Sequence, residues 1–330
     1  MLPIIAISIG DINGIGPEII LKSFDRSDLF EICRPVVFGP EAVLNHYREK
    51  FGIGVQVNRI DEISAAQEQR LNLVEVPGEF VPQEIGRPTA GSGRSCITAI
   101  EAAFAATLSG DAQALVTAPI SKEAISMAGS RFRGHTDMLA SMSGNEEDVL
   151  MILSSNSMNV GLVTIHVPLA QVVPLITQER VERTIRQGHR AMDYDFGIAD
   201  PKIAVLALNP HAGDGGVLGI EESEILQPAI SAMQDEGIDV EGPFPADGFF
   251  SAHTKQIYDL IIAMYHDQGL VPFKMQARGR GVNISAGLPI VRTSPDHGTA
   301  YNIATRGIAS AESMKEAIYF ARTIALNRLQ

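Results

Sequence analysis

Cysteine is scarce in this sequence: only Cys33 and Cys96 occur among 330 residues. Two thiols cannot build a disulfide framework or a cysteine-rich zinc site. Long apolar runs are missing as well, because no stretch reaches the roughly 18 residues that a membrane-spanning helix needs. The apolar start, Leu2–Ile9, has no basic residues ahead of it and ends at Gly10-Asp11, which suits a buried strand better than a secretory signal. We therefore expect a cytoplasmic protein without a membrane span.

Positive charge is also in short supply. The chain has 26 Lys and Arg against 39 Asp and Glu, a net charge of −13, and a field of this sign repels nucleic acids and anionic lipids. Neither is predicted as a partner, and an anionic ligand must bind in a local basic pocket. With 45% hydrophobic and 20% charged residues the chain is neither disordered nor collagen-like, and its length predicts about two domains.

Several common catalytic signatures are absent. Gly10–Glu18 joins a predicted strand to a predicted helix, but it has neither the G-x-G-x-x-G order of a Rossmann fold nor the lysine of a P-loop. It could hold an anion at the helix N-terminus, although a tight structural turn is the role that the pattern favours. No G-x-S-x-G motif occurs, which disfavours serine hydrolase chemistry.

Short apolar, β-branched runs alternate with longer amphipathic stretches. This pattern predicts an α/β fold with a largely parallel sheet and helices on its faces. The predicted strands include Val160–Ile165, Ile203–Leu208 and Leu260–Met264. The glycine-rich stretch Ala277–Gly287 is expected to form a loop.

Three histidines directly follow, or nearly follow, these predicted strands: His166, His211 and His266. Because the carboxyl ends of parallel strands converge on one edge of a sheet, residues distant in sequence can meet there. Neutral imidazole is a common ligand of zinc and other divalent metals. Asp247 and Asp267 could complete or orient such a site. The alternative for each histidine is an ordinary hydrogen-bonded loop residue, and the spacing matches no local metal motif.

The stretch from Gln268 to Pro295 contains no Asp or Glu, although the whole chain is acidic. It holds several cations and a neutral donor, interleaved with glycines: Lys274, Arg278, Arg280, Arg292 and Asn283. Arginine suits carboxylate and phosphate groups, and glycine lets backbone amides approach an anion. The stretch predicts a pocket for a small phosphorylated or carboxylated substrate. A solvated basic face is the alternative.

Two further segments place hydrogen-bond donors ahead of predicted helices. They are Gly134–Asp137 and His297–Ala300. In the first segment Thr136 or Asp137 could simply cap a helix. Each segment is a weak signal by itself.

Five motifs taken together resemble the 4-hydroxythreonine-4-phosphate dehydrogenases, a family of pyridoxal phosphate biosynthesis. The motifs are Gly134–Leu139, Leu208–Gly216, Met264–Gly269, Gly281–Ser285 and Gly287–Ala300. The resemblance extends from Gly10-Asp11 to the C-terminal helix, nearly the whole chain. It implies two α/β/α domains with a cleft between them, similar to isocitrate and isopropylmalate dehydrogenases. We place the first domain at 1–130 plus about 295–330 and the second at 131–294.

The resemblance also implies roles for individual residues. The family's metal ligands match His166, His211 and His266, in a site shared between the subunits of a homodimer. Its substrate-binding residues match His135, Thr136, Lys274, Asn283 and Arg292. The cofactor implied is NAD, and His297, Gly298, Thr299 and Ala300 resemble the adenine-side loop of the wider superfamily. Zinc is the metal that imidazole ligands favour, with magnesium or cobalt as alternatives.

The reaction implied is NAD-dependent oxidation of 4-phosphooxy-L-threonine at C3, followed by decarboxylation to 3-amino-2-oxopropyl phosphate. Asp247 or Asp267 would transfer a proton or support the metal site. Three alternatives stay open. One is a related dehydrogenase acting on 4-phospho-erythronate or 4-phospho-threonate. The others are a metal-dependent lyase or transferase without NAD, and a non-catalytic anion-binding module.

Overall fold

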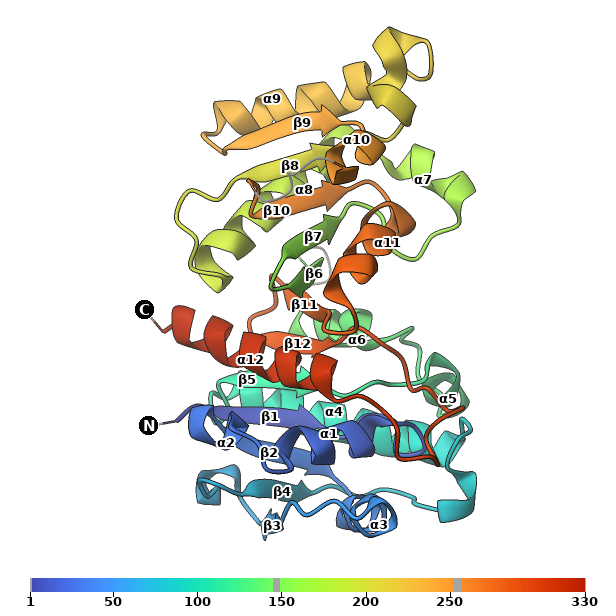
Figure 1. Cartoon of the computed structure of the whole chain (residues 1–330), viewed down its shortest axis with the longest axis vertical. Coiled ribbons are helices and arrows are strands. Elements are labelled where there is room, and N and C mark those ends of the chain that lie inside the picture. Colours follow the sequence, from blue (N-terminus) through green and yellow to red (C-terminus); the bar gives the residue numbers. More distant parts are fainter. Residues whose placement is uncertain (1, 145–148, 252–256, 330) are drawn as a thin grey trace. The chain divides into compact units, whose positions relative to one another are not determined.

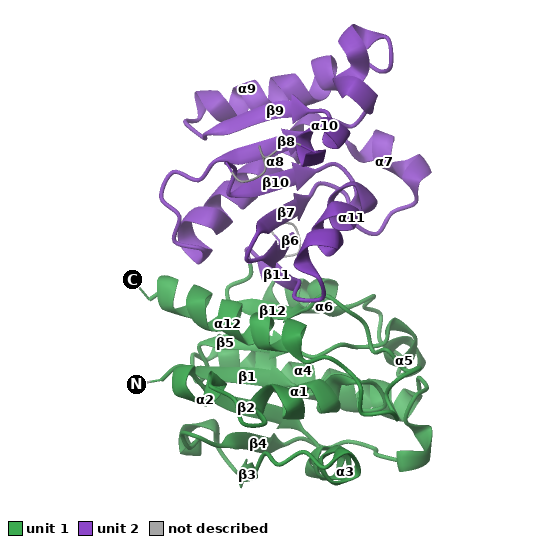
Figure 2. Cartoon of the chain, in the orientation of Figure 1, with its two compact units in different colours: residues 1–147, 288–329 green, residues 148–287, 330 purple. Residues whose placement is uncertain are grey.

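The structure is a computed structural model that describes residues 2–144, 149–251 and 257–329. The chain forms two compact units, coloured separately in Figure 2. Unit 1 comprises Met1–Glu147 and Leu288–Leu329, and unit 2 comprises Asp148–Gly287. The domain limits expected from the sequence differ from these, since residues 131–147 and 288–294 lie in unit 1. Among the described residues, no helix combines the length and apolar character that crossing a bilayer demands.

Unit 1 is built on a parallel sheet with the strand order β3-β4-β2-β1-β5-β12. Its strands are β1 (Ile4–Ser8), β2 (Arg34–Gly39), β3 (Val57–Ile60), β4 (Leu71–Glu75), β5 (Ala114–Thr117) and β12 (Arg292–Pro295). All residues of β1 and β5 are buried, as is typical of parallel strands covered by helices on both faces. The sheet therefore provides the rigid frame of this unit.

Helices cover both faces of this sheet (Figure 1). They are α1 (Gly16–Phe24), α2 (Leu29–Ile32), α3 (Glu41–Phe51), α4 (Ala90–Leu108), α5 (Lys122–Met127), α6 (His135–Ser143) and α12 (Glu312–Asn327), with short 3₁₀ turns at Ile63–Ala65 and Pro82–Glu84. The small residues of α4, including Cys96, let it pack closely on the strands. Both cysteines are free and buried, and burial raises the pKa of Cys33 to about 12. Neither thiol is thus suited to nucleophilic chemistry.

Unit 2 has a mixed sheet with the strand order β11-β6-β7-β10-β8-β9. Its strands are β6 (Leu150–Ser155), β7 (Met158–Leu162), β8 (Ile203–Leu206), β9 (Val240–Phe244), β10 (Leu260–Ala263) and β11 (Val282–Ala286). β7, β10, β8 and β9 are parallel, whereas β6 and β11 run antiparallel to their neighbours. The expected loop at Ala277–Gly287 is therefore wrong for its second half, because residues 282–286 form β11.

Helices lie on the two faces of the unit 2 sheet. They are α7 (Leu169–Leu175), α8 (Gln178–Arg190), α9 (Gln227–Asp235), α10 (Ala246–Ser251) and α11 (His266–Ala277), with irregular helical segments at Ala191–Asp195, Pro210–Gly216 and Glu222–Leu226. Along β10 the side chains alternate between the two faces of the sheet. Ile261 lies in the same hydrophobic cluster as Phe273 of α11. Leu260 lies against α8 on the other face, since a Cβ added at Gly188 would be 2.4 Å from its side chain. This alternation is the period-two pattern of a sheet buried on both sides. The α/β class expected from the sequence is confirmed.

Candidate active site

The ends of β7 and β10 bring two of the predicted metal ligands together in unit 2. Beyond the strands, the Val163 amide donates to the Ala263 carbonyl (2.9 Å), and the Thr164 amide and hydroxyl donate to the Met264 carbonyl (3.1 and 2.7 Å). The parallel pairing thus continues to the residues just before each histidine. The imidazole rings of His166 and His266 consequently lie with their centroids 5.7 Å apart.

Asp267 interacts with one of these rings. Its Oδ1 lies 2.7 Å from Nδ1 of His266, and the His266 side chain is 37% exposed. When Nδ1 carries the proton and donates to the carboxylate, the lone pair of Nε2 stays available for a cation. The Asp267 carboxylate therefore lies where it can accept a hydrogen bond from His266.

A cavity of about 240 Å³ opens beside this histidine pair. Its lining is Ile165, His166, Val167, Leu169, Val172, Tyr265, His266 and Asp267. The two imidazoles and the carboxylate form its polar part, and α7 supplies an apolar wall. A concave site with a few convergent polar groups is the usual form of a small-molecule site.

His211 follows β8, the strand next to β10 in the sheet. The side chain of Gln268 links the ends of these two strands, since its Nε2 donates to the Ala207 carbonyl (2.6 Å) and its Oε1 accepts from the Met264 amide (2.7 Å). Within the described part of one chain, however, no three His, Cys, Asp or Glu side chains lie close enough to share a metal ion. His211 and the exposed Asp247 on α10 thus do not complete a ligand set with the pair.

Unit 1 contains a buried cationic group next to a second predicted ligand-binding residue. Arg292 begins β12 and is only 2% exposed. Its Nε and Nη2 donate to Oγ1 of Thr117, at the end of β5, over 3.2 and 2.6 Å. Burial lowers the pKa of Arg292 to about 9. A guanidinium held in this way gains interaction energy from a bound anion.

His135 lies close enough to Arg292 for the guanidinium charge to disfavour protonation of the ring. Burial, and then the charge of Arg292, hold the pKa of His135 well below its usual range, although the ring has a hydrogen bond with the Ala118 backbone. The side chain keeps some exposed surface, but its Nε2 is buried and has no hydrogen-bond partner among the described residues. The ring is therefore neutral at pH 7, with one nitrogen available to a ligand. Thr136 follows it in the first turn of α6.

The other two predicted substrate anchors lie in unit 2. Lys274 is exposed on α11, and Asn283 lies on β11. Oδ1 of Asn283 is buried without a hydrogen-bond partner among the described residues. Buried amide oxygens are normally paired, so this atom is suited to accept a donor from a ligand.

The segment His297–Ala300 lies against the loop that follows β1. The Ile15 amide donates to the Thr299 carbonyl (3.0 Å), and a Cβ at Gly14 would lie 2.9 Å from Thr299. His297 and Gly298 are exposed, and nothing lies within 4 Å of the Cβ position of Gly298. The segment is thus anchored at Thr299 and open at Gly298, where a ligand could approach the backbone.

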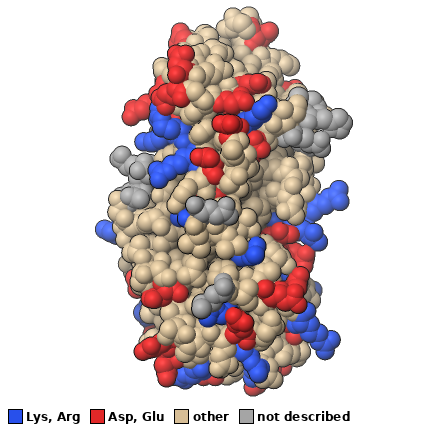
Figure 3. Space-filling model, turned by 90° about the vertical axis from the view of Figure 1, so that its left-hand side faces the viewer, with Lys and Arg blue, Asp and Glu red and all other residues tan. Residues whose placement is uncertain are grey.

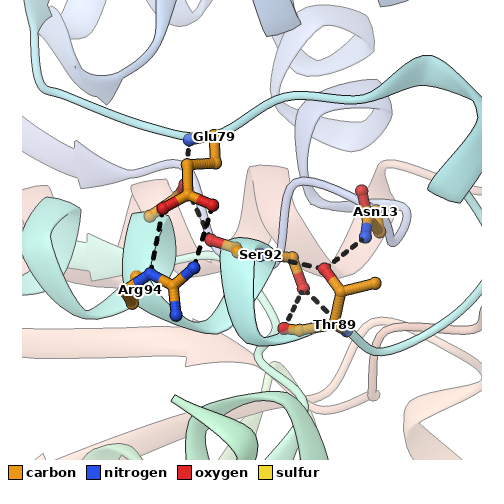
Figure 4. Close-up of polar contacts among 7 residues, drawn as sticks. Asn13, Glu79, Thr89, Ser92 and Arg94 are labelled. Atoms are coloured by element: carbon orange, nitrogen blue, oxygen red, sulfur yellow. Dashed lines mark hydrogen bonds and ion pairs between the residues drawn. The ribbon is translucent and has the colours of Figure 1, made fainter.

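A buried polar cluster that the sequence did not indicate lies beside this segment. The Tyr301 hydroxyl donates to Oδ2 of Asp11 (2.6 Å), and the Ser92 hydroxyl lies 3.3 Å from the same oxygen. Figure 4 shows Ser92 and Thr89 at the start of α4, where Nδ2 of Asn13 donates to the Thr89 hydroxyl (3.2 Å). Burial raises the pKa of Asp11 above its usual value, against the hydrogen bonds that lower it. The only signal in the sequence is Asp11, two residues after the apolar run Leu2–Ile9.

Charged residues of both signs are mixed on the face drawn in Figure 3. Such mixing is ordinary for an acidic protein with 26 Lys and Arg. The face drawn in Figure 3 thus gives no indication of a large basic surface for a polyanion.

Comparison with known proteins identifies the family. The family model described as pyridoxal phosphate biosynthetic protein PdxA matches residues 31–321. The chain belongs to this family. The 4-hydroxythreonine-4-phosphate dehydrogenase of Bacteroides thetaiotaomicron is 43% identical over 324 residues, covering 98% of this chain and 89% of that protein.

The chain is also similar to a solved structure and to a second named dehydrogenase. The crystal structure of 4-hydroxythreonine-4-phosphate dehydrogenase from Klebsiella pneumoniae superposes with a TM-score of 0.88 at 38% identity, over 98% of each chain. The D-threonate 4-phosphate dehydrogenase of Cupriavidus necator is 39% identical over 330 residues, covering 99% of this chain and 98% of that protein. The chain is thus similar to dehydrogenases named for two different phosphorylated substrates.

Proposed function

We propose that this protein oxidises 4-phosphooxy-L-threonine at C3 with NAD⁺ and that the product loses CO₂ to give 3-amino-2-oxopropyl phosphate. The observation that carries the proposal is the pair of imidazoles at the ends of β7 and β10, beside a cavity of about 240 Å³. Membership of the PdxA family supports the reaction class.

The His166 and His266 pair suits a divalent cation of the zinc or cobalt type. Imidazole nitrogens are preferred ligands of these ions, and Asp267 orients one ring as an outer partner commonly does. We propose that His211 supplies the third ligand in a homodimer whose subunits share the site. When bound, the cation would polarise the substrate hydroxyl and the carbonyl formed from it.

The residues of the chain itself bind and orient the substrate in this proposal. Five residues anchor the phosphate and the carboxylate: Arg292, His135, Thr136, Lys274 and Asn283. Arg292 supports this role because it is a buried cation that an anion stabilises. Fixing both ends of a small substrate places its C3 hydrogen in one orientation, which contributes to the rate by positioning.

We place the nucleotide at His297, Gly298, Thr299 and Ala300. The open backbone at Gly298, next to a segment anchored by the loop after β1, supports this placement. NAD⁺ held by this segment would accept the hydride from C3 of the substrate, and the C3 hydroxyl would give up its proton. The resulting β-keto acid then releases CO₂, and protonation of the enolate carbon completes the reaction. Asp247 and Asp267 are the candidate proton-transfer groups.

A second candidate is oxidation of D-threonate 4-phosphate, which replaces the amino group of the substrate by a hydroxyl. The similarity to the Cupriavidus necator enzyme favours it. The phosphate-binding residues proposed above would serve both substrates equally, so the difference must arise at the C2 substituent.

Initial rates of NADH formation decide between these candidates. Purified protein supplied with Zn²⁺, Co²⁺ or Mg²⁺ is assayed with 4-phosphooxy-L-threonine, D-threonate 4-phosphate and 4-phospho-erythronate. We expect the highest kcat/KM for 4-phosphooxy-L-threonine. We also expect a large loss of kcat/KM in His166→Ala and in His266→Ala. Activity on D-threonate 4-phosphate alone would establish the second candidate. Absence of NADH formation with all three substrates would overturn both.

A further inference from the structure

The backbone around His211 has an unusual conformation. Six consecutive residues, His211 to Gly216, have positive φ angles: 53°, 53°, 79°, 44°, 64° and 95°. Three of them, His211, Ala212 and Asp214, are not glycine. Residues other than glycine adopt this left-handed backbone conformation only at a cost in free energy, because their Cβ comes close to the following carbonyl oxygen. A left-handed turn of this length persists only if its surroundings hold it.

The buried carboxylate of Glu222 lies at the base of this turn, next to the partly buried Glu221, whose Oε2 also accepts from Nδ2 of Asn209 (2.8 Å). Glu222 is 5% exposed, and its Oε1 accepts hydrogen bonds from the backbone amides of Leu208 (2.9 Å) and Asn209 (2.6 Å). Its Oε2 accepts from Nδ2 of Asn209 (3.0 Å). These donors belong to the residues directly ahead of the turn, so the carboxylate fixes the direction in which the chain leaves β8.

The turn also packs directly on this carboxylate. A Cβ at Gly213 would lie 2.8 Å from Oε2 of Glu222 and 2.7 Å from the Gly219 carbonyl. The Leu218 amide donates to the Gly213 carbonyl (3.0 Å) and closes the loop on its other side. Glu222 thus contacts both the start and the middle of the turn that carries His211.

We propose that Glu222 is a positioning residue for His211, acting through the backbone of the left-handed turn. The inference rests on the proposed function, in which His211 is a metal ligand. The carboxylate would not touch the metal. It would keep the imidazole in the one backbone conformation from which it can bind, as outer residues commonly do at metal sites.

A purely structural role makes a different prediction. Glu222 begins the helical segment Glu222–Leu226, and an acidic residue in a first helical turn interacts favourably with the helix dipole. If that were its whole role, its loss would lower stability and leave the metal affinity of the folded protein unchanged. Metal affinity measured separately from stability therefore separates the two roles.

The experiment compares Co²⁺ binding by the full-length chain and its Glu222→Gln variant. Isothermal titration calorimetry gives the Kd, and the visible absorption spectrum of bound Co²⁺ reports its ligand geometry. We expect Glu222→Gln to raise the Kd for Co²⁺ by about tenfold or more and to change the spectrum. Glu224→Gln is the matched control, since it removes an exposed carboxylate from the same segment, and its Kd should stay within about twofold of the wild-type value.

A second substitution tests the mechanism. Ala212 has a φ of 53°, so Ala212→Gly makes the left-handed conformation less costly without touching Glu222. In the Glu222→Gln background this change should recover part of the lost Co²⁺ affinity. If Glu222→Gln does not fold, Glu222→Asp keeps the charge but withdraws it by one methylene, and the folded variant should again bind Co²⁺ more weakly.

The outcomes that overturn the inference are distinct from those that overturn the proposed function. If His211→Ala lowers Co²⁺ affinity but folded Glu222→Gln and Glu222→Asp bind Co²⁺ like the wild type, the metal site stands and the role of Glu222 is refuted. Failure of Ala212→Gly to restore any affinity to Glu222→Gln also contradicts a role exerted through the turn. If the wild-type protein binds no Co²⁺, the metal site and this inference fall together.

Discussion

Replacement of Thr117 by Val should weaken substrate binding more than a comparable buried substitution nearby. The Thr117 hydroxyl accepts two N–H donors of Arg292, at 3.2 and 2.6 Å. Val has a similar shape but no acceptor. A hydrogen bond to a charged group contributes about 1.5–3 kcal/mol, so the free energy of unfolding should fall by about this amount. Once Thr117 no longer holds the guanidinium, we expect the KM for the phosphorylated substrate to rise about tenfold, equivalent to ~1.4 kcal/mol.

Thr293→Val is the matched control. Thr293 follows Arg292 on β12 and is equally buried, but its hydroxyl donates to the Ala317 carbonyl (2.7 Å). Loss of this neutral hydrogen bond should cost about 1 kcal/mol of stability without changing KM. Urea unfolding gives the stabilities, and initial rates of NADH formation give KM. An unchanged KM in Thr117→Val, or an equal rise in Thr293→Val, would refute the role of Thr117 in holding Arg292 for the substrate.

Three further predictions concern individual titratable groups. Because the pKa of His135 is held well below its usual range and a bound anion favours the charged ring, binding of a phosphate-bearing ligand should take up protons and tighten as pH falls. Calorimetry in buffers of different ionisation enthalpy measures this uptake, which His135→Gln should abolish. Asp267→Asn should weaken Co²⁺ binding about tenfold if the carboxylate orients His266, and an unchanged Kd would contradict that role. The folded-state pKa of Asp11 is raised above 3.8, so the contribution of Asp11 to stability should fall as pH rises from 3.8 through its folded-state pKa. Because other carboxylates titrate in the same range, urea titrations should show this effect as a decline, with rising pH, in the stability of the wild type relative to Asp11→Asn.

The strand ends that carry His166 and His266 were predictable from sequence, because an apolar run followed directly by a polar residue marks the edge of a parallel sheet. The pairing of the two rings then follows from strand adjacency, which the continued hydrogen bonds at Thr164 and Met264 show. The strand β11 was not predictable in the same way. Its neighbouring glycines and basic residues indicate a loop, whereas residues 282–286 pair with β6 and form a strand.

The contribution of Glu222 to the turn at His211 was also hidden from sequence reasoning. The sequence shows two glutamates at the start of a predicted helix, a pattern that the helix dipole explains without further contacts. Which carboxylate turns inward depends on the backbone of the preceding loop, with its run of positive φ angles. The positive φ angles at His211 and Ala212 are imposed by tertiary contacts, since neither residue favours the left-handed region by itself.

Unit 1 takes its last strand and last long helix from residues 288–329, after the whole of unit 2. During synthesis a ribosome therefore delivers an uninterrupted unit 2 before it delivers β12 and α12. A nascent chain that stops before Leu288 lacks Arg292 and leaves the sheet face that α12 normally covers open to water. Chains that terminate before that point should thus aggregate or be degraded, because their unit 1 lacks the residues that complete its sheet and cover it.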